Sequence, residues 1–310
     1  MMSKIPILIL TGPTAVGKTD LSVKLAEILN AEIISADATQ IYKKMDIGSA
    51  KITHREMKGV PHHLIDILNP DDEFSVSEYG DLAKKCIEDI HNRGKFPIIT
   101  GGTGLYLNSI LYKMNFGNSN SDERLRLELN ELLNNKGIDY MHNLLKSYSE
   151  EVANKIHKNN TKRVIRAIEI FKLGGELGDF SKDLELNEKY DAKIVVLNRN
   201  RKLLYDRINY RVDLMFENGL IEEVKSLVDE GFSKDLVSMK AIGYKEIIDY
   251  LNGITTLEES KSIIKQNSRR YAKRQITWFK RYKDAFWIDL DNTKNIDEQI
   301  DIIMNLLKER

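Results

Sequence analysis

The chain has 310 residues, 42% of them hydrophobic and 30% charged, and its 47 basic and 47 acidic side chains cancel to a net charge of zero. This composition, with 18 glycines, 5 prolines and a single cysteine, excludes disordered, collagen-like and disulfide-rich proteins and predicts about two globular domains. The longest apolar runs are shorter than the ~20 residues of a membrane helix and no secretory signal precedes the first one, so we expect a cytoplasmic protein without a membrane partner.

The N-terminal part of the chain alternates between strand-like and helix-like segments. An apolar run at 5–10 leads into a glycine-containing loop, after which leucines recur at helical spacing. Further strands are predicted at 32–35 and 96–100, with a helix over 77–93 between them. This alternation is typical of an α/β fold with a parallel sheet, in which ligands bind at the carboxyl ends of the strands.

The middle of the chain departs from this alternation. Two stretches without periodicity, 115–121 and 174–187, predict hinges, and helices are predicted between them at 123–133 and 139–173. We therefore expect a helical insertion domain inserted into the α/β core. The predicted core comprises 1–115 and 191–310, and the predicted insertion comprises 116–190.

The C-terminal part is predicted to be helical and locally basic. A strand at 194–197 precedes helices predicted at 201–217, 220–229 and 257–282. Residues 261–283 include no acidic residue and nine basic ones: Lys261, Lys265, Arg269, Arg270, Lys273, Arg274, Lys280, Arg281 and Lys283. Aromatic residues are interleaved with them, and a basic stripe of this kind is typical of a nucleic-acid-binding surface.

A phosphate-binding loop follows the first predicted strand. The residues are Gly12, Pro13, Thr14, Ala15, Val16, Gly17, Lys18 and Thr19, which fit the pattern GxxxxGK[ST] between a strand and a helix. In such a loop the backbone N–H groups and the helix N-terminus hold phosphate, the lysine adds a cation, and the last hydroxyl can hold Mg²⁺. The loop therefore predicts binding of a diphosphate or triphosphate, as in nucleotide-binding and ATP-binding proteins.

The expected second acidic residue of a phosphate-loop kinase is missing. Kinases and ATPases of this class usually have a strand ending in a carboxylate that helps to hold Mg²⁺. Here the strand at 96–100 ends in glycines, and only Asp37 follows a predicted strand directly. Asp37 is either a magnesium ligand or a general base. A small-molecule kinase and a non-enzymatic RNA-binding NTPase module both remain alternatives at this point.

Two arginines on the helix at 201–217 can reach one anion. Arg207 and Arg211 are four residues apart and therefore lie on the same face. The alternative is that they only form surface ion pairs with Asp206 and Asp213.

Eight blocks of sequence occur in the order seen in the tRNA dimethylallyltransferases, which this chain resembles. They cover nearly the whole chain, at 12–19, 35–42, 45–51, 61–66, 101–106, 162–167, 242–246 and 271–279. The resemblance is to the short bacterial form, which lacks the C-terminal zinc finger of the eukaryotic relatives. Ala38 departs from the family, in which a serine commonly follows the aspartate.

The resemblance implies transfer of the dimethylallyl group from dimethylallyl diphosphate to N6 of the adenosine 3′-adjacent to the anticodon. The tRNAs would be those that read codons beginning with U. Independently of the resemblance, we expect a monomer. Lys18 and Arg211, with Mg²⁺ on Thr19, would stabilise the leaving diphosphate. Asp37 would accept the proton of the attacking amine, and Thr103 and Gln40 would hold the flipped adenine.

The resemblance also implies three groups of tRNA contacts. They are Asp37, Ala38, Thr39, Gln40 and Thr103 near the flipped base; Arg126, Lys162, Arg163, Val164, Ile165 and Arg166 in the insertion; and Arg274 in the basic stripe. The cations would neutralise phosphates and position the backbone. For Arg126, the alternative that it is an ordinary solvated arginine has equal weight. Arg124 lies only two residues away, and only the alignment with the family selects Arg126 over Arg124.

Overall fold

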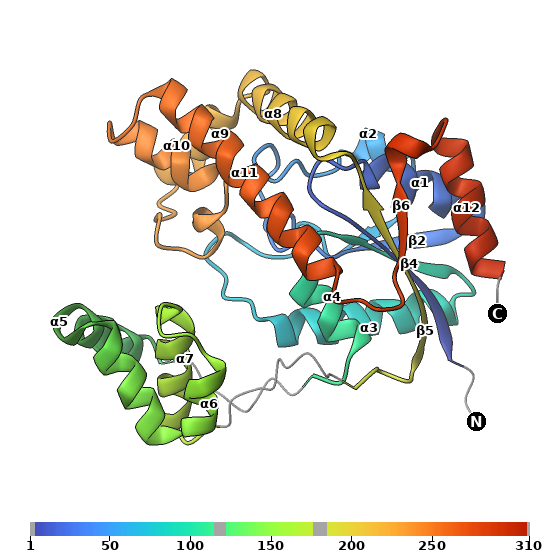
Figure 1. Ribbon diagram of the computed structural model, residues 1–310. Helices are drawn as coiled ribbons and strands as arrows, with labels where there is room; N and C mark the ends of the chain where they lie inside the picture. Colours follow the sequence, from blue (N-terminus) through green and yellow to red (C-terminus); the bar gives the residue numbers. More distant parts are fainter. Residues whose placement is uncertain (1–3, 115–121, 176–184, 309–310) are drawn as a thin grey trace. The chain divides into compact units, whose positions relative to one another are not determined.

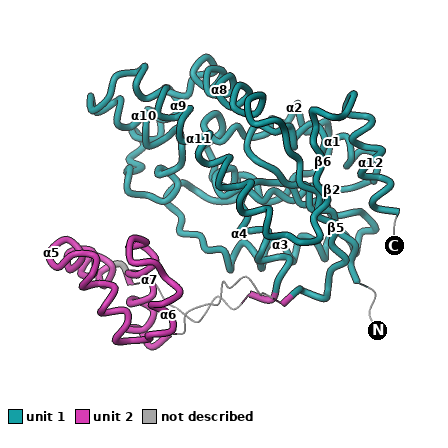
Figure 2. Tube along the Cα trace, in the orientation of Figure 1, with its two compact units in different colours: residues 1–112, 186–310 teal, residues 113–185 magenta. Residues whose placement is uncertain are grey.

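The computed structural model describes residues 4–114, 122–175 and 185–308. The chain divides into two compact units, one formed by residues 1–112 and 186–310 and the other by residues 113–185 (Figure 2). These limits differ by a few residues from the predicted 116 and 190. The predicted hinge at 115–121, and most of the one at 174–187, lie outside the described residues.

The first unit is built on a six-stranded, all-parallel sheet with the order β3-β2-β4-β1-β5-β6. The strands are β1 (Ile5–Thr11), β2 (Ala31–Ser35), β3 (His62–His63), β4 (Phe96–Gly101), β5 (Tyr190–Asn198) and β6 (Phe286–Asp289). The predicted α/β class is confirmed. Strands β3 and β6 were not predicted, and β3, with two residues, is too short to show a hydrophobic pattern.

Helices cover both faces of the sheet. They are α1 (Lys18–Leu29), α2 (His54–Met57), α3 (Val76–Asn92), α4 (Gly104–Leu111), α8 (Arg201–Glu217), α9 (Leu220–Asp229), α10 (Tyr244–Leu251), α11 (Leu257–Phe279) and α12 (Ile296–Lys308). Along β1, Ile7 and Ile9 enter one core cluster and Leu8 and Leu10 the other, as the period of a strand requires. Helix α3 packs into the first cluster, whereas α1 and α12 lie side by side on the second (Figure 1).

The second unit is a small helical domain with its own core. Its helices are α5 (Glu123–Tyr148), α6 (Glu150–Lys155) and α7 (Thr161–Lys172), and Leu129, Met141 and Ile168 are among its buried residues. The single helix predicted over 139–173 is wrong, because Ser149 caps a new helix by accepting a hydrogen bond from the Val152 N–H. The helix predicted at 123–133 instead continues through a kink at Gly137.

None of the helices in the described parts of the chain is long and apolar enough to cross a membrane.

Candidate functional site

A cavity of about 1060 Å³ lies in the first unit, beyond the carboxyl ends of β1, β2 and β4. Several predicted site residues line it: Thr14, Ala15, Val16, Gly17, Lys18, Thr19, Asp37, Thr39, Gln40, Arg211 and Arg274. This position agrees with the rule that parallel sheets bind ligands at their carboxyl edge. Residues that are up to 261 positions apart in the sequence meet here.

The phosphate loop connects β1 to α1, and Lys18 begins the helix. The Lys18 ammonium donates hydrogen bonds to the carbonyl oxygens of Gly12 and Pro13, both at 2.9 Å. Burial, followed by the charge of Arg211, lowers the pKa of Lys18 to about 8, and Asp37 opposes this shift. The loop thus holds a cation that loses its proton at a lower pH than an ordinary lysine, and an anionic ligand would favour its charged form.

Arginines from three positions contact consecutive residues of the phosphate loop. Arg211 donates to the Thr14 hydroxyl at 3.4 Å and to the Ser49 carbonyl at 3.3 Å. The Arg207 side chain donates to the Ala15 carbonyl at 2.9 Å. Both arginines therefore face the loop, as the anion-binding interpretation predicts.

The alternative ion pair for these arginines is not formed at Asp213, which instead pairs with Lys261 at 2.8 Å and Lys265 at 2.7 Å. A third arginine, Arg199, was not predicted. It donates to the Val16 carbonyl at 3.0 Å and pairs with Asp291 at 2.6 Å. No sequence motif marks Arg199, because its partners lie 183 and 92 positions away.

Asp37 is held by its own loop and by the turn after β4. One carboxylate oxygen accepts the N–H groups of Thr39 at 2.9 Å and Gln40 at 3.3 Å. The Thr103 hydroxyl accepts the N–H of Ala38 at 3.0 Å, while the Thr103 N–H donates to the Ala36 carbonyl at 3.0 Å. The structure therefore brings Asp37 and Thr103 together, with the carboxylate in a fixed orientation beside the phosphate loop.

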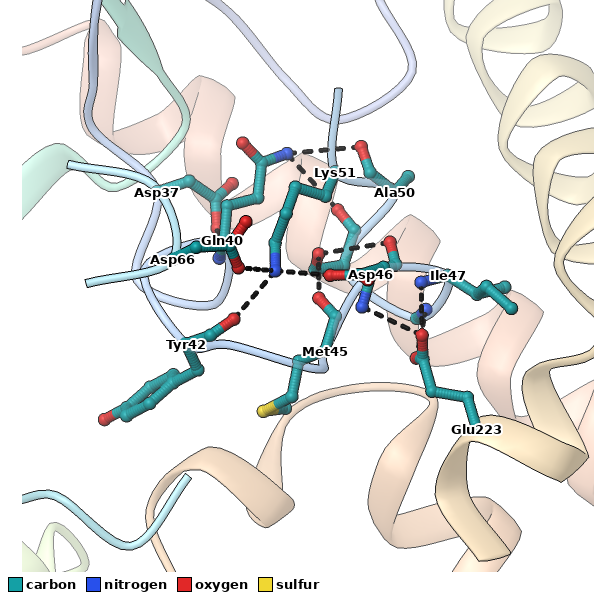
Figure 3. Close-up of polar contacts among 12 residues, drawn as sticks. Asp37, Gln40, Tyr42, Met45, Asp46, Ile47, Ala50, Lys51, Asp66 and Glu223 are labelled. Carbon is teal, nitrogen blue, oxygen red and sulfur yellow. Dashed lines mark hydrogen bonds and ion pairs between the residues drawn. The ribbon is translucent and has the colours of Figure 1, made fainter. Parts of the chain in front are cut away.

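Residues 46–51 form another wall of the cavity. Figure 3 shows the polar contacts of the loop that contains them. The Gln40 amide donates to the carbonyls of Ser49 at 3.4 Å and Ala50 at 3.2 Å. The Lys51 ammonium, whose side chain is only 5% exposed, contacts the carboxylates of Asp46 and Asp66, each at 2.5 Å. Gln40 is thus anchored to this loop through its amide nitrogen, which leaves its carbonyl oxygen as the group that could face a ligand.

Glu223 on α9 fixes the same loop and was not predicted. Its carboxylate accepts the backbone N–H groups of Asp46, Ile47 and Gly48 at 2.9, 2.7 and 3.0 Å (Figure 3). It also accepts the hydroxyl of Tyr244 at 2.7 Å. Because Arg211 bonds the Ser49 carbonyl, this clamp also supports the arginine beside the phosphate loop.

The basic stripe on α11 is less uniform than its sequence predicts. Lys261 and Lys265 are neutralised by Asp213 of the neighbouring helix α8, an acid outside the stripe. Farther along, Arg274 is exposed and lies 5.6 Å from the ring centre of Tyr271. Although the stripe itself includes no acidic residue, Asp213 offsets the charge of its first turns, and the exposed cations are concentrated from Arg270 onward.

In the second unit, the predicted contacts divide between surface and core. Lys162 and Arg163 are exposed, whereas Val164 and Ile165 are 1% and 6% exposed and pack in the helical core. The side chains of this last pair therefore do not belong to a binding surface. Arg126 and Arg166 both pair with the buried carboxylate of Glu169, at 2.9 and 2.7 Å, so Arg126 is not simply a solvated arginine.

Comparison with known proteins identifies the family. A family model described as IPP transferase matches residues 40–282. The chain belongs to the IPP transferase family. It is 61% identical over 308 residues to the tRNA dimethylallyltransferase of Clostridioides difficile (strain 630), with 99% of each chain covered. It is 52% identical over 303 residues to the protein of the same name from Alkaliphilus oremlandii (strain OhILAs), with 97% of each covered.

Solved structures of the family share this fold. The tRNA isopentenylpyrophosphate transferase of Bacillus halodurans matches with a TM-score of 0.74 and 47% identity, covering 99% of this chain and 98% of that one. A eukaryotic dimethylallyltransferase acting on tRNA matches with a TM-score of 0.79 and 27% identity, covering 99% of this chain and 80% of that one. The resemblance seen in the eight sequence blocks is thus confirmed, and this IPP transferase is a transferase rather than a kinase.

Proposed function

We propose that this IPP transferase moves the dimethylallyl group of dimethylallyl diphosphate to N6 of the adenosine 3′-adjacent to the anticodon, in tRNAs reading codons that begin with U. Diphosphate is released. The observation that carries this proposal is that Asp37 and the phosphate loop line one cavity, while the neighbouring strand β4 ends in Gly101 and not in a carboxylate. The names of the relatives support the tRNA acceptor.

The donor diphosphate would bind at the phosphate loop. Its N–H groups, the Lys18 ammonium and the Arg211 guanidinium would stabilise the negative charge that develops as the bond to the prenyl carbon breaks. All of these groups are positioned before the donor arrives, which limits the reorganisation needed at the transition state.

The site also fits a magnesium ion. In phosphate loops of this pattern, the Ser or Thr hydroxyl holds Mg²⁺ together with the phosphates of the substrate. The Thr19 hydroxyl, in the first turn of α1 and on the cavity wall, would hold the ion with the diphosphate oxygens. When bound, the ion would supply neutralisation of the diphosphate charge.

The acceptor would approach from the opposite side of the cavity. Asp37 would accept the proton that N6 loses as the new carbon–nitrogen bond forms. The base must leave its stack to reach this position, and Thr103, Gln40 and the neighbouring backbone at Ala38 and Thr39 would hold it.

The tRNA backbone would be bound by exposed cations. Arg274 on α11 and Lys162 and Arg163 on α7 can neutralise phosphates directly, and Arg126 and Arg166 can do so while keeping their contacts with Glu169. We propose that the protein acts as a monomer, in the cytoplasm where tRNAs are used.

The test is mass spectrometry of the anticodon fragment of unmodified tRNA after incubation with the purified protein, dimethylallyl diphosphate and Mg²⁺. We expect a gain of one C5H8 group on the adenosine beside the anticodon, without ATP. The matched control is Asp37→Asn, which keeps the size of the side chain and removes the base. Absence of the gain with the wild-type protein, together with turnover of ATP, would contradict the proposal.

A further inference from the structure

A buried carboxylate in the helical second unit contacts two partly exposed arginines. The Glu169 side chain on α7 is 0% exposed, whereas the side chains of Arg126 on α5 and Arg166 on α7 are 41% and 34% exposed. A carboxylate that is removed from water needs charged or hydrogen-bonding partners to stay ionised. The two arginines therefore belong to the structure of this unit as well as to its surface.

Three donors share the Glu169 carboxylate. Arg126 Nε lies 2.9 Å from it, Arg166 Nη1 lies 2.7 Å from it, and the backbone N–H of Asp122 donates to it at 3.0 Å. Burial raises the pKa of Glu169, but the hydrogen bonds from Arg166, Asp122 and Arg126 outweigh this effect and lower the pKa below its usual value. The carboxylate is thus charged at neutral pH, and charge-assisted hydrogen bonds fix the orientation of both guanidiniums.

Part of the Arg126 guanidinium stays available to a ligand. Its contact with Glu169 uses Nε, and its terminal nitrogens have no partner among the described residues. A guanidinium that is already held on one edge can bind a phosphate with the other edge, without first losing its freedom of rotation.

Arg124, two residues earlier on α5, is the natural comparison. Its side chain is 90% exposed, and its partner Glu128 is 60% exposed and lies 3.7 Å away. An exposed pair at this distance contributes little and orders neither side chain well. Contact of a phosphate with Arg124 would therefore cost more side-chain entropy than contact with Arg126. The structure thus distinguishes two arginines that are close neighbours in the sequence.

We propose that Glu169 is a positioning residue for tRNA binding, which fixes Arg126 and Arg166 in the orientation that contacts the phosphates of tRNA. This rests on the proposed function, in which this unit binds tRNA. The bond to the N–H of Asp122, the N-terminal cap of α5, fixes the start of that helix to the same carboxylate. The arginines are therefore ordered when the unit folds, and RNA binding does not have to order them.

Charge alone predicts the opposite effect of removing this carboxylate. A negative charge repels the phosphates of RNA, so neutralising Glu169 should strengthen RNA binding if only charge matters. A positioning role requires the same substitution to weaken binding, because the two arginines lose the group that holds them. The sign of the change in affinity therefore separates the two explanations.

The experiment uses the whole chain and measures its dissociation constant for an unmodified tRNA that reads a codon beginning with U, at several salt concentrations. The variants are Glu169→Gln, which removes the charge at similar volume, and Glu169→Asp, which keeps the charge on a shorter side chain. The matched control is Glu128→Gln, which removes the acid beside Arg124. Ile168→Val, in the core of the same unit, controls for a general loss of stability. Thermal melting checks that each variant is folded.

Both Glu169 variants should bind tRNA about tenfold more weakly, because binding must then order two arginine side chains. The slope of log K against log salt should fall by about one. In prenylation assays the KM for tRNA should rise while kcat stays within about twofold, since Glu169 lies in the second unit and the cavity lies in the first.

Glu128→Gln and Ile168→Val should leave the dissociation constant within about twofold of the wild-type value. Unchanged or tighter tRNA binding by folded Glu169→Gln, or an equal loss of binding in Ile168→Val, would overturn the positioning role. Failure of the wild-type protein to prenylate tRNA would overturn the proposed function instead, so the two failures are distinct.

Discussion

The depressed pKa of Lys18 makes a quantitative prediction about donor binding. Burial and Arg211 lower this pKa from 10.5 to about 8 in the free protein. A diphosphate in the loop would favour the charged ammonium and raise the pKa again. Binding above pH 8 should therefore take up a proton at Lys18, and affinity should fall as the pH rises.

The size of the effect follows from the fraction of Lys18 that is already charged. With a pKa of about 8, roughly three quarters of the free protein carries the ammonium at pH 7.5 but only about a tenth at pH 9.0. If the bound form stays protonated at both values, affinity falls about eightfold between them. The ligand must be the organic ester dimethylallyl diphosphate, because phosphate esters complete their ionisation near pH 6 and its charge is therefore nearly constant over this range, whereas inorganic diphosphate still loses a proton within it.

The assay is calorimetry of dimethylallyl diphosphate binding at pH 7.5 and 9.0 in buffers with different ionisation enthalpies. The buffer dependence should show uptake of about 0.9 proton at pH 9.0. Lys18→Arg keeps its charge across this range, so its affinity should be nearly independent of pH. An eightfold loss that persists in Lys18→Arg, or a wild-type affinity equal at both values, would refute the assignment of the titration to Lys18.

Three further predictions concern the base, the RNA surface and the sheet. Asp37→Asn should lower single-turnover prenylation about 100-fold to 10,000-fold with little change in RNA affinity, and a parallel loss of RNA binding would count against a base. Arg274→Ala should weaken RNA binding and reduce the slope of log K against log salt by about one, and an unchanged slope would make this arginine structural. Glu32 is a buried carboxylate whose pKa is lowered mainly by Arg93, so its stabilisation is present above pH 4.5 and is lost as the pH falls below it. In urea unfolding, Glu32→Gln should cost about 3 kcal/mol at pH 7 and much less at low pH, and an equal cost at both would contradict this contribution.

The parts of the fold and site that could be predicted are those with a local signal. The buried strand β1 is a continuous apolar run, and the phosphate loop follows it directly in sequence. Helices α8 and α9 have the predicted limits, and helix α11 ends at Phe279, near the predicted 282. Helical periodicity and terminal signals are sufficient for such elements.

The parts that could not be predicted depend on distant residues. Glu223 reads as an ordinary acidic residue in the first turn of α9, yet it binds three N–H groups about 176 positions earlier. Gln275 lies in a basic stripe, and its contact with Thr14 spans 261 positions. Asp213 is a further example. It neutralises Lys261 and Lys265, although no acidic residue lies near these lysines in the basic stripe. Polar contacts of this kind carry no periodic pattern.

The structure also gives a physical reason why this loop does not serve a kinase. The strand end where a kinase would carry its second carboxylate is Gly101 of β4, followed by Gly102. A Cβ atom at Gly101 would lie 2.2 Å from the Ala36 carbonyl oxygen, and one at Gly102 would lie 2.2 Å from the Gln275 nitrogen. Any aspartate here would displace either the backbone before Asp37 or the Gln275 side chain on α11. At Gly101, the close packing against the backbone before Asp37 therefore excludes a second acid, whereas a side chain at Gly102 would have to move only the end of the Gln275 side chain.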